Sequence, residues 1–279
     1  MRIRWLSERD LSAIAYWGEL EGWLVDTEEL ARIRSRYFYH AFGAYDGSFL
    51  RGALMGYCHE KTAWLCNFIV DPVMRRGGIG AKLFETALEA IAAEKQTQRL
   101  FAEKAMTAFY ARYGFKEEGA AVRYELKNGG KTTTLLAAHQ VRTLETKEHT
   151  TLSAFAKVAF GEARSEFIGA DMIHKSSLML ASANGALHSR VIGKYVFVGP
   201  FLAREGAYTD AELLLRAVIA VRGMKPIALD VPEENSEAVR LLKLYGFKAK
   251  GATIRMTRGE PIQERGDMIY SFATAASHG

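Results

Sequence analysis

A long internal repeat constrains the fold of this chain more than any other feature of its sequence. The pattern Tyr-Gly-Phe-Lys, two residues, Gly-Ala, two residues, Arg starts at Tyr113 and recurs 132 positions later at Tyr245. Identities at matching spacing over such a long period indicate a duplicated domain rather than a short solenoid unit. The length of 279 residues also exceeds the usual size of one compact core. We therefore expect two domains, residues 1–138 and 139–279.

The composition is that of a globular protein, with 49% hydrophobic and 25% charged residues. No run approaches the roughly 20 apolar residues of a membrane span, and the N-terminus lacks a signal-peptide core, so we expect a cytoplasmic protein without a membrane partner. The net charge of +5 comes from dispersed Lys and Arg, which disfavours a nucleic-acid partner. Cys58 and Cys66 flank a predicted hairpin, and we expect two free thiols on neighbouring strands and no metal site.

Strands followed by a helix are predicted in the middle of the first half. Apolar runs predict strands over 54–59 and 64–70, and Pro72 ends the second strand because it has no N–H to donate. A glycine-rich stretch follows, and apolar residues at helical spacing predict a helix over 81–95. Further predicted elements are helices over 27–39 and 107–113, strands over 121–126 and 140–144, and a turn at Asp46-Gly47.

The segment Arg75-Arg76-Gly77-Gly78-Ile79-Gly80, between strand and helix, is a candidate anion site. N–H groups in the first turn of a helix lack intrahelical partners, and the helix dipole adds about half a positive charge there. Glycines keep side chains from blocking the backbone, and each charge-assisted hydrogen bond to a phosphate contributes about 1.5–3 kcal/mol. The loop therefore predicts a phosphate-bearing ligand held by backbone amides.

Two common phosphate motifs do not fit this chain. The dinucleotide fingerprint needs a third glycine where Leu83 stands. Gly130-Lys131-Thr132 resembles the end of a nucleotide-triphosphate loop, but Glu125 stands in the place of its first glycine, so we interpret this segment as a surface turn.

Residues 70–80 read Val-Asp-Pro, two residues, Arg, two residues, Gly, one residue, Gly, and this pattern resembles the cofactor motif of the GNAT superfamily of acyl-CoA N-acyltransferases. The resemblance implies an α/β (α+β) fold of two tandem GNAT-like domains, each a mixed central sheet flanked by helices. It also implies acetyl-CoA (coenzyme A) as the cofactor, with its pyrophosphate at this loop. The cofactor-binding residues that it implies are Phe68, Ile69, Val70, Arg75, Arg76, Gly77, Gly78, Ile79, Gly80 and Ala81.

A later segment also resembles this family, whose second motif runs Asn, two residues, Ala, two residues, Leu, Tyr, three residues, Gly, Phe. Residues 109–115 stand at that spacing, while Glu103 and Met106 replace the motif Asn and Ala. The resemblance implies that Tyr110 is catalytic and donates to the departing thiolate. A phenol with a pKa near 10 suits a thiol with a pKa near 8.5 without a large mismatch.

The general base is left open by the sequence. Many family members carry a Glu on the strand before the loop, but residues 64–70 contain no acid and no histidine. The resemblance implies that this strand runs beside the pantetheine arm and that an N–H of Phe68 or Val70 faces the developing oxyanion. Glu21 and Trp23 form a tentative acceptor site, since an acid beside an aromatic suits a cationic amine. The candidate bases are Glu21, His59, Glu60 and Glu103, with a water chain as the alternative.

The second half retains the architecture but not these groups. Phe197-Val198-Gly199-Pro200 reads as the counterpart of the first-half segment Phe68-Ile69-Val70-Asp71-Pro72, and a helical pattern over 211–221 follows it. Counted from Pro200, Glu205 stands in the place of Gly77, where its charge would repel a phosphate. Leu242 stands in the place of Tyr110. The motif residues that the second copy retains are Asn235 and Ala238. We expect residues 139–279 to have a structural or acceptor-shaping role without a phosphate loop.

The expected activity is that of an acyl-CoA-dependent N-acyltransferase of the EC 2.3.1 class. An acetyl group would pass from acetyl-CoA to the primary amine of a small-molecule or peptide acceptor by direct attack. The alternative is a catalytically weak acyl-CoA-binding or sensor module, which the missing strand glutamate favours and which Tyr110 with an intact loop disfavours.

Overall fold

The computed structural model describes residues 1–25, 27, 30–31, 40–93, 95, 97–127, 140–164, 168 and 175–273. Contacts divide the chain into two compact units. Unit 1 contains Met1–Phe101 and Thr257–Pro261, and unit 2 contains Ala102–Met256 and residues 262–273. The predicted domain boundary at residues 138 and 139, the turn predicted at 130–132 and most of the helix predicted over 27–39 lie outside the described residues.

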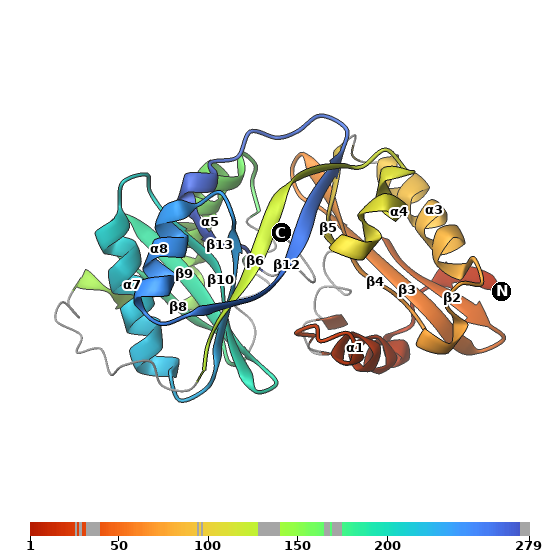
Figure 1. Cartoon of the computed structure of the whole chain (residues 1–279), viewed down its shortest axis with the longest axis horizontal. Helices are drawn as coiled ribbons and strands as arrows, with labels where there is room; N and C mark the ends of the chain where they lie inside the picture. The colour runs from red at the N-terminus through yellow and green to blue at the C-terminus, as the bar shows by residue number, and fades with distance from the viewer. Residues whose placement is uncertain are drawn as a thin grey trace. The chain divides into compact units, whose positions relative to one another are not determined.

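Unit 1 is built on a mixed sheet in the order β1-β2-β3-β4-β5 (Figure 1). Neighbours are antiparallel from β1 to β4, whereas β4 and β5 are parallel. The hairpin between β2 and β3 turns at the predicted position, where Gly47 has a φ of 59°. The strands are β1 Arg2–Trp5, β2 His40–Asp46, β3 Phe49–Cys58, β4 Thr62–Val70 and β5 Thr97–Glu103, the last two residues of β5 belonging to unit 2.

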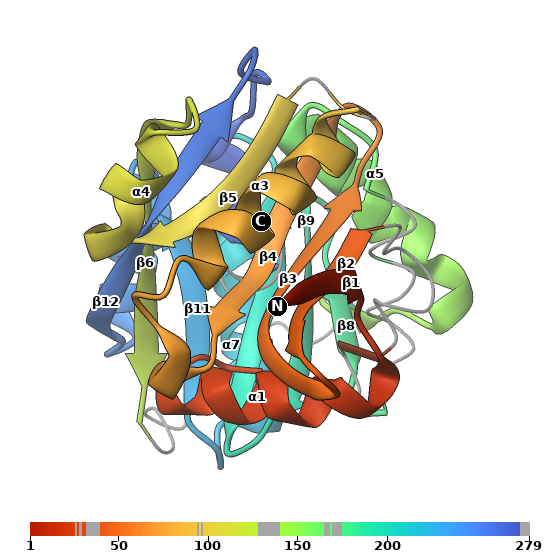
Figure 2. The ribbon, with the colours of Figure 1, turned by 90° about the vertical axis from the view of Figure 1, so that its right-hand side faces the viewer.

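Two helices cover opposite faces of the unit 1 sheet (Figure 1). α1, Leu11–Leu20, packs against β3 and β4, and α3, Ile79–Ala92, lies across the same strands on the other face (Figure 2). The helix α3 buries the apolar residues Ile79, Leu83, Phe84, Ala87, Leu88 and Ile91. Burying one large aliphatic side chain stabilises the fold by about 1.5–3 kcal/mol. This stripe therefore fixes α3, and with it the loop at its N-terminus, at the end of β4.

Unit 2 contains a second mixed sheet in the order β12-β6-β11-β10-β9-β8-β7, with β13 paired to β10. Helices α7 and α8 cover one face and bury the core of this unit against β8 to β11, and α5 contacts β9 and β10. The strands are β6 Lys116–Leu126, β7 Arg142–Thr143, β8 Leu178–Ala181, β9 Gly185–Ile192, β10 Tyr195–Ala203, β11 Ile227–Pro232, β12 Lys248–Arg258 and β13 Ile269–Ser271. The helices are α4 Thr107–Ala111, α5 His149–Phe160, α7 Tyr208–Arg222 and α8 Ser236–Leu244, with short 3-10 turns at η3 Lys104–Met106, η5 Thr146–Glu148 and η6 Gly266–Met268.

The two units do not coincide with the two halves of the sequence, because β6 from the first repeat lies in unit 2 and the end of β12 lies in unit 1. β6, from the first repeat, pairs antiparallel with β11 of the second repeat, from Ile227↔Leu126 to Pro232↔Ala121. In unit 1, residues at the end of β12 lie beside β5, where Thr97 Oγ1 donates to Glu260 O at 2.8 Å. The repeat that reveals the duplication, residues 113–123 and 245–255, therefore lies in unit 2 in both copies.

One predicted correspondence between the repeats is wrong. Pro72 begins the short helix η2, Pro72–Met74, after β4, whereas Pro200 lies inside β10. β10 carries an extra residue relative to β9 at this point, and β4 carries one relative to β3 near Phe68. A bulge tolerates proline because a ladder N–H is not needed there. The bulges match at the same offset as the repeat, so Pro200 corresponds to Phe68.

The placement of the cysteines also differs from the prediction. Both are free thiols, as expected, but they are not cross-strand neighbours. Cys58 lies opposite Ala63 and Cys66 lies opposite Met55, because the turn joining β3 and β4 sets a register that separates them.

Candidate functional site

The loop that joins β4 to α3, residues 71–78, begins with a turn fixed by Asp71. The Asp71 side chain accepts a hydrogen bond from Val73 N at 3.2 Å and caps η2. The same carboxylate accepts from Arg51 Nη1 at 3.0 Å, and the Asp71 side chain is only 12% exposed. These bonds set the direction in which the chain leaves the sheet toward the glycines.

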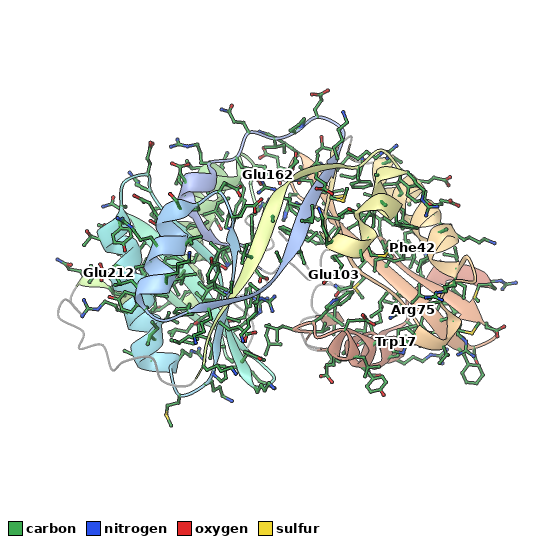
Figure 3. The ribbon with its side chains drawn as sticks, in the orientation of Figure 1. Trp17, Phe42, Arg75, Glu103, Glu162 and Glu212 are labelled. Atoms are coloured by element: carbon green, nitrogen blue, oxygen red, sulfur yellow. The ribbon has the colours of Figure 1, made fainter. Side chains whose placement is uncertain are left out.

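Arg75 lies between the start of this loop and the end of α1, the helix that carries Trp17 (Figure 3). Its Nε donates to Val70 O at 3.1 Å and its Nη2 donates to Glu21 Oε1 at 2.7 Å. The two side chains are 41% and 37% exposed, so this ion pair contributes at most about 1 kcal/mol. The structure thus joins two residues that the sequence assigned to different parts of the site, the cofactor loop and the acceptor pocket.

Arg76, Gly77 and Gly78 form the exposed crest of the loop. Arg76 has a φ of 66° and Gly78 has a φ of 77°. A residue other than glycine costs about 1–2 kcal/mol in this left-handed region, and such strain concentrates at functional sites. A Cβ placed on Gly78 would meet no atom within 4 Å, so the space above the crest is open.

The helix α3 begins with N–H groups that precede its hydrogen-bond ladder. Lys82 N donates to Gly78 O at 3.2 Å, and the N–H groups of Ile79, Gly80 and Ala81 come before this bond. The first turn holds no acidic residue, and Gly78 at the N-cap supplies no side-chain oxygen. The amides and the helix dipole are therefore directed at whatever anion lies above the loop.

Gly80 allows the first turn of α3 to approach the end of β4. A Cβ on Gly80 would lie 3.4 Å from Phe68 Cζ and 3.4 Å from Val70 Cγ2. The Phe68 ring in turn packs against Phe84 of α3 at a centroid distance of 5.5 Å. Ile69, the remaining predicted strand residue, is buried and lies opposite Ala53 of β3. The structure therefore gathers the predicted residues of the strand and of the helix into one corner of unit 1.

Asn67 is a feature of this corner that the sequence reasoning missed. It has a φ of 48°, is 2% exposed and stands at the bulge where β4 carries one residue more than β3. Its Nδ2 lies 3.5 Å from Cys66 Sγ and 3.8 Å from Met55 Sδ. A bulge removes one residue from the ladder and redirects the backbone that follows, here the N–H of Phe68. Asparagine tolerates the left-handed region better than other residues with a Cβ, and this was the available signal.

β4 and β5 separate beyond the first part of their length. Among the described residues they pair at Thr62↔Thr97, Ala63↔Gln98 and Trp64↔Arg99. Residues 65–70 of β4 lie beyond the last of these pairs, on the side where the loop begins. Parallel strands that separate leave backbone donors and acceptors for a ligand, because no neighbouring strand satisfies them.

Tyr110 lies in unit 2, on the short helix α4, and is 7% exposed. Its ring contacts Phe109 and Phe115 edge-on, at centroid distances of 5.2 and 6.2 Å. Burial, and after it the charge of Glu103, raises the pKa of Tyr110. Both effects disfavour the phenolate, so this hydroxyl remains a donor throughout the physiological range.

The other candidates occupy separate parts of unit 1. Trp23 is half-buried, and its N donates to Gly18 O at 2.9 Å, so it folds back onto α1 two residues after Glu21. His59 and Glu60 lie in the turn between β3 and β4, at the far end of β4 from the loop. At about 3.3 Å per residue, these residues are roughly 25 Å or more from the Phe68 bulge, which disfavours both as bases for chemistry proposed at the bulge.

Two family models for the acetyltransferase (GNAT) domain match the sequence, over residues 21–117 and 153–271. The first match includes both the glycine loop and Tyr110. This chain belongs to the GNAT superfamily. Its two matched domains confirm the predicted tandem form, and the mixed sheets flanked by helices confirm the predicted fold class. GNAT domains generally bind acetyl-CoA, and GNAT acetyltransferases act on small-molecule or peptide acceptors.

Several solved structures resemble this one along nearly its whole length. A putative acetyltransferase from Pyrococcus horikoshii superposes with a TM-score of 0.84 at 22% identity, covering 99% of this chain and 95% of that one. A GCN5-related N-acetyltransferase from Sphaerobacter thermophilus gives 0.67 at 14% identity, covering 95% and 98%. A tandem GNAT protein from the clavulanic acid biosynthesis pathway gives 0.65 at 15% identity, covering 94% and 99%. No curated protein matches the sequence.

The described part of the chain contains no group of three or more His, Cys, Asp or Glu side chains arranged to hold a metal ion. Within the same residues, none of the helices has both the length and the apolar character that crossing a bilayer requires.

Proposed function

We propose that this GNAT protein is an N-acetyltransferase that transfers the acetyl group of acetyl-CoA to the primary amine of a small-molecule or peptide acceptor. The observation that carries the proposal is the start of α3. Left-handed Gly78, open space above it and a first turn without acidic residues form a backbone cradle for an anion. Such a cradle suits the pyrophosphate of coenzyme A.

The residues of the loop fit a diphosphate in both charge and shape. The N–H groups of residues 79–81 supply donors, and each charge-assisted bond contributes about 1.5–3 kcal/mol. Arg75 and Arg76 supply two positive charges, and the guanidinium of Arg75 is exposed enough to turn toward a phosphate oxygen. We assign the binding of the pyrophosphate to residues 75–81.

The pantetheine arm is assigned to the opening between β4 and β5. Backbone groups of residues 65–70 lie beyond the β4–β5 pairs, and amide groups of the arm can hydrogen-bond to them as a strand would. Phe68 lies in the bulge that begins at Asn67, where β4 carries one residue more than β3. From its motif position we assign the N–H of Phe68 as the donor to the carbonyl oxygen on which negative charge develops.

When bound, acetyl-CoA supplies a thioester that a neutral amine attacks, so that a C–N bond forms, the C–S bond breaks, the amine loses a proton and the thiolate gains one. We assign the contact with the departing sulfur to Tyr110, on the strength of its motif position. Its pKa is raised above the ordinary phenol value, which itself exceeds that of a thiol. Tyr110 therefore stabilises the thiolate by donating a hydrogen bond, with the hydroxyl proton staying on the phenol.

Glu21 is proposed to contact the acceptor amine after the cofactor has bound. In the structure its carboxylate is held by Arg75 at 2.7 Å. A diphosphate competes for the same guanidinium and carries more negative charge, so its binding releases Glu21. The freed carboxylate, with Trp23 two residues later, favours a cationic amine at the end of α1. This arrangement couples the acceptor site to the occupancy of the cofactor loop.

The test is a thiol-release assay with acetyl-CoA and a panel of small amines, amino acids and peptide N-termini. Amine-dependent release of coenzyme A, with the acetylated amine detected by mass spectrometry, is the expected result. The alternative function, an acyl-CoA sensor, predicts tight binding by calorimetry with the same slow thiol release whether or not an amine is present. Binding without amine-dependent release across the panel therefore supports the sensor and counts against the enzyme.

A further inference from the structure

The parallel strands of unit 2 separate in the same way as those of unit 1. β10 and β11 pair at Val196↔Ile227 and Phe197↔Ala228, and the bulge of β10 follows at Gly199. α7 connects β10 to β11 as α3 connects β4 to β5. The opening between β10 and β11 is therefore the topological counterpart of the opening between β4 and β5.

In unit 2 this opening holds a segment of the same chain, residues 266–273. Its strand β13 pairs antiparallel with β10, with Phe201 opposite Ser271. On the other side, Phe272 N donates to Asp230 O of β11 at 2.8 Å. Asp230 N donates to Ser271 Oγ at 3.1 Å, and all of these atoms are buried. The segment thus bonds to both of the strands that have separated.

Asn235, the motif asparagine that the second repeat retains, holds this segment. Its Oδ1 accepts from Ala238 N at 2.9 Å and caps α8. Its Nδ2 lies 3.2, 3.1 and 2.9 Å from the carbonyl oxygens of Gly266, Asp267 and Ile269. Asn235 is 3% exposed, so losing these partners would leave a buried amide without hydrogen bonds. This motif residue therefore hydrogen-bonds to a peptide of the same chain.

Side chains also pack closely around residues 266–273. Gly199 stands at the bulge, where a Cβ would overlap the carbonyl oxygen of Phe272 and lie 3.0 Å from that of Ala273. The Tyr270 ring packs against Phe201 at 5.1 Å, and Phe272 is 1% exposed. Only a residue without a side chain fits at Gly199 while the segment is in place.

The phosphate end of the counterpart site is also occupied by groups of the chain. Asp210 lies in the first turn of α7, and its carboxylate accepts from Asn184 N at 3.0 Å. Glu205, in the loop before α7, is paired with Arg265 at 2.6 Å. Where α3 presents amides without an acid, α7 already carries a carboxylate of its own.

We propose that the cleft between β10 and β11 has become a binding site for an extended peptide, and that residues 266–273 fill it in the place where unit 1 takes the pantetheine arm. This inference rests on the proposed function for the role of the unit 1 cleft. It follows that unit 2 binds no acyl-CoA and that one acyl-CoA binds per chain.

Hydrogen exchange of the full-length protein, followed by mass spectrometry with and without coenzyme A, tests the proposal. We expect amides of residues 266–273 to exchange at least about a hundredfold more slowly than in an unstructured chain. Gly199→Ala is expected to accelerate them at least about tenfold. Gly251→Ala, where a Cβ meets nothing within 4 Å, is the matched control and is expected to exchange as the parent does. Ser271→Ala, which removes one hydroxyl partner, gives a smaller acceleration of the same amides if Gly199→Ala does not fold.

Coenzyme A is expected to slow exchange in peptides covering residues 75–83 and to leave those of β10 and β11 unchanged. Exchange of residues 266–273 at the rate of an unstructured chain overturns the proposal. So does slowing of β10 and β11 by coenzyme A with a stoichiometry of two per chain. If coenzyme A slows no peptide, the proposed function fails, whereas the exchange of residues 266–273 still decides whether the cleft holds a peptide.

Discussion

The two connections from strand to helix, β4 to α3 and β10 to α7, show how one architecture serves two purposes. The first has eight residues, 71–78, and the second has four, 204–207. The longer connection has room for η2, two arginines and a glycine crest, and it ends at an N-cap without a side-chain oxygen. The shorter connection enters α7 directly, and Asp210 follows in its first turn.

The strand pairs next to these connections, β4–β5 and β10–β11, also differ. Both pairs start parallel and then separate after two or three residue pairs. β10 and β11 are joined again by residues 266–273, whereas residues 65–70 of β4 lie beyond the β4–β5 pairs. A separated parallel pair exposes backbone groups that need partners. In unit 2 the chain itself supplies partners to the separated pair, and in unit 1 we propose that the ligand does.

The largest effect is expected when a carboxylate like that of Asp210 in unit 2 is placed in the loop of unit 1. Gly78→Asp puts an acid at the N-cap of α3, where its negative charge repels a phosphate. Losing about two charge-assisted bonds raises the Kd for coenzyme A about a thousandfold by calorimetry. Gly206→Asp is the matched control, because Gly206 has a φ of 74° and equally open surroundings. Equal losses for both variants would contradict the assignment of the loop.

The second effect concerns the hydroxyl of Tyr110. Tyr110→Phe is expected to lower kcat about a hundredfold with little change in Kd for coenzyme A. Tyr245→Phe is the control, because Tyr245 is another tyrosine of unit 2 whose pKa is raised, here to about 12, by burial and by its hydrogen bond to Glu212.

The pH profile gives a separate check on Tyr110. A group that acts in its protonated form and has a raised pKa loses activity only as the pH passes that raised value. The kcat of the parent enzyme is therefore expected to show no loss assignable to Tyr110 up to about pH 10, the ordinary phenol value. A fall in kcat at lower pH that Tyr110→Phe abolishes would refute this role.

The third effect tests the peptide in the unit 2 cleft through stability. Asn235→Ala removes a helix cap and the donors to residues 266–269, and is expected to lower the free energy of unfolding by about 2 kcal/mol in urea. Asn235→Asp keeps the acceptor for Ala238 N and removes only the donors. If Asn235→Asp were as stable as the parent, only the hydrogen bond from Ala238 N would contribute to stability, and the bonds that Asn235 donates to residues 266–269 would not.

The smallest effect is expected for the pair that joins the loop to α1. Glu21→Gln frees Arg75 for the cofactor and lowers the Kd for coenzyme A by at most about fivefold, since an exposed pair contributes about 1 kcal/mol or less. The KM for the amine is expected to rise at the same time. Glu19→Gln, on the exposed side of α1, is the control. Tighter cofactor binding without a change in KM would leave Glu21 as a partner of Arg75 alone.

Much of the candidate site follows from local sequence. Apolar residues at helical spacing predicted α3, and the glycines predicted a loop whose backbone is not blocked by side chains, which the open space at Gly78 matches. The predicted loop therefore has the expected shape, and the role of its residues in binding stays a prediction. The bulge at Asn67 was not predicted, because asparagine occurs in many turns and its neighbours read as an ordinary strand.

The sequence by itself determined that the fold is duplicated, and it predicted a phosphate loop in the first copy alone. The tertiary structure decided which strands complete each sheet and what fills the second cleft. The alternation of side chains specifies which face of a strand is buried, but backbone hydrogen bonds are the same for any partner. β6 and β12 carry the same repeat and therefore read alike, although β6, from the first repeat, lies in unit 2 and pairs with β11. The segment of residues 266–273 is likewise short, and its partners Asp230 and Asn235 lie more than 30 residues away in sequence.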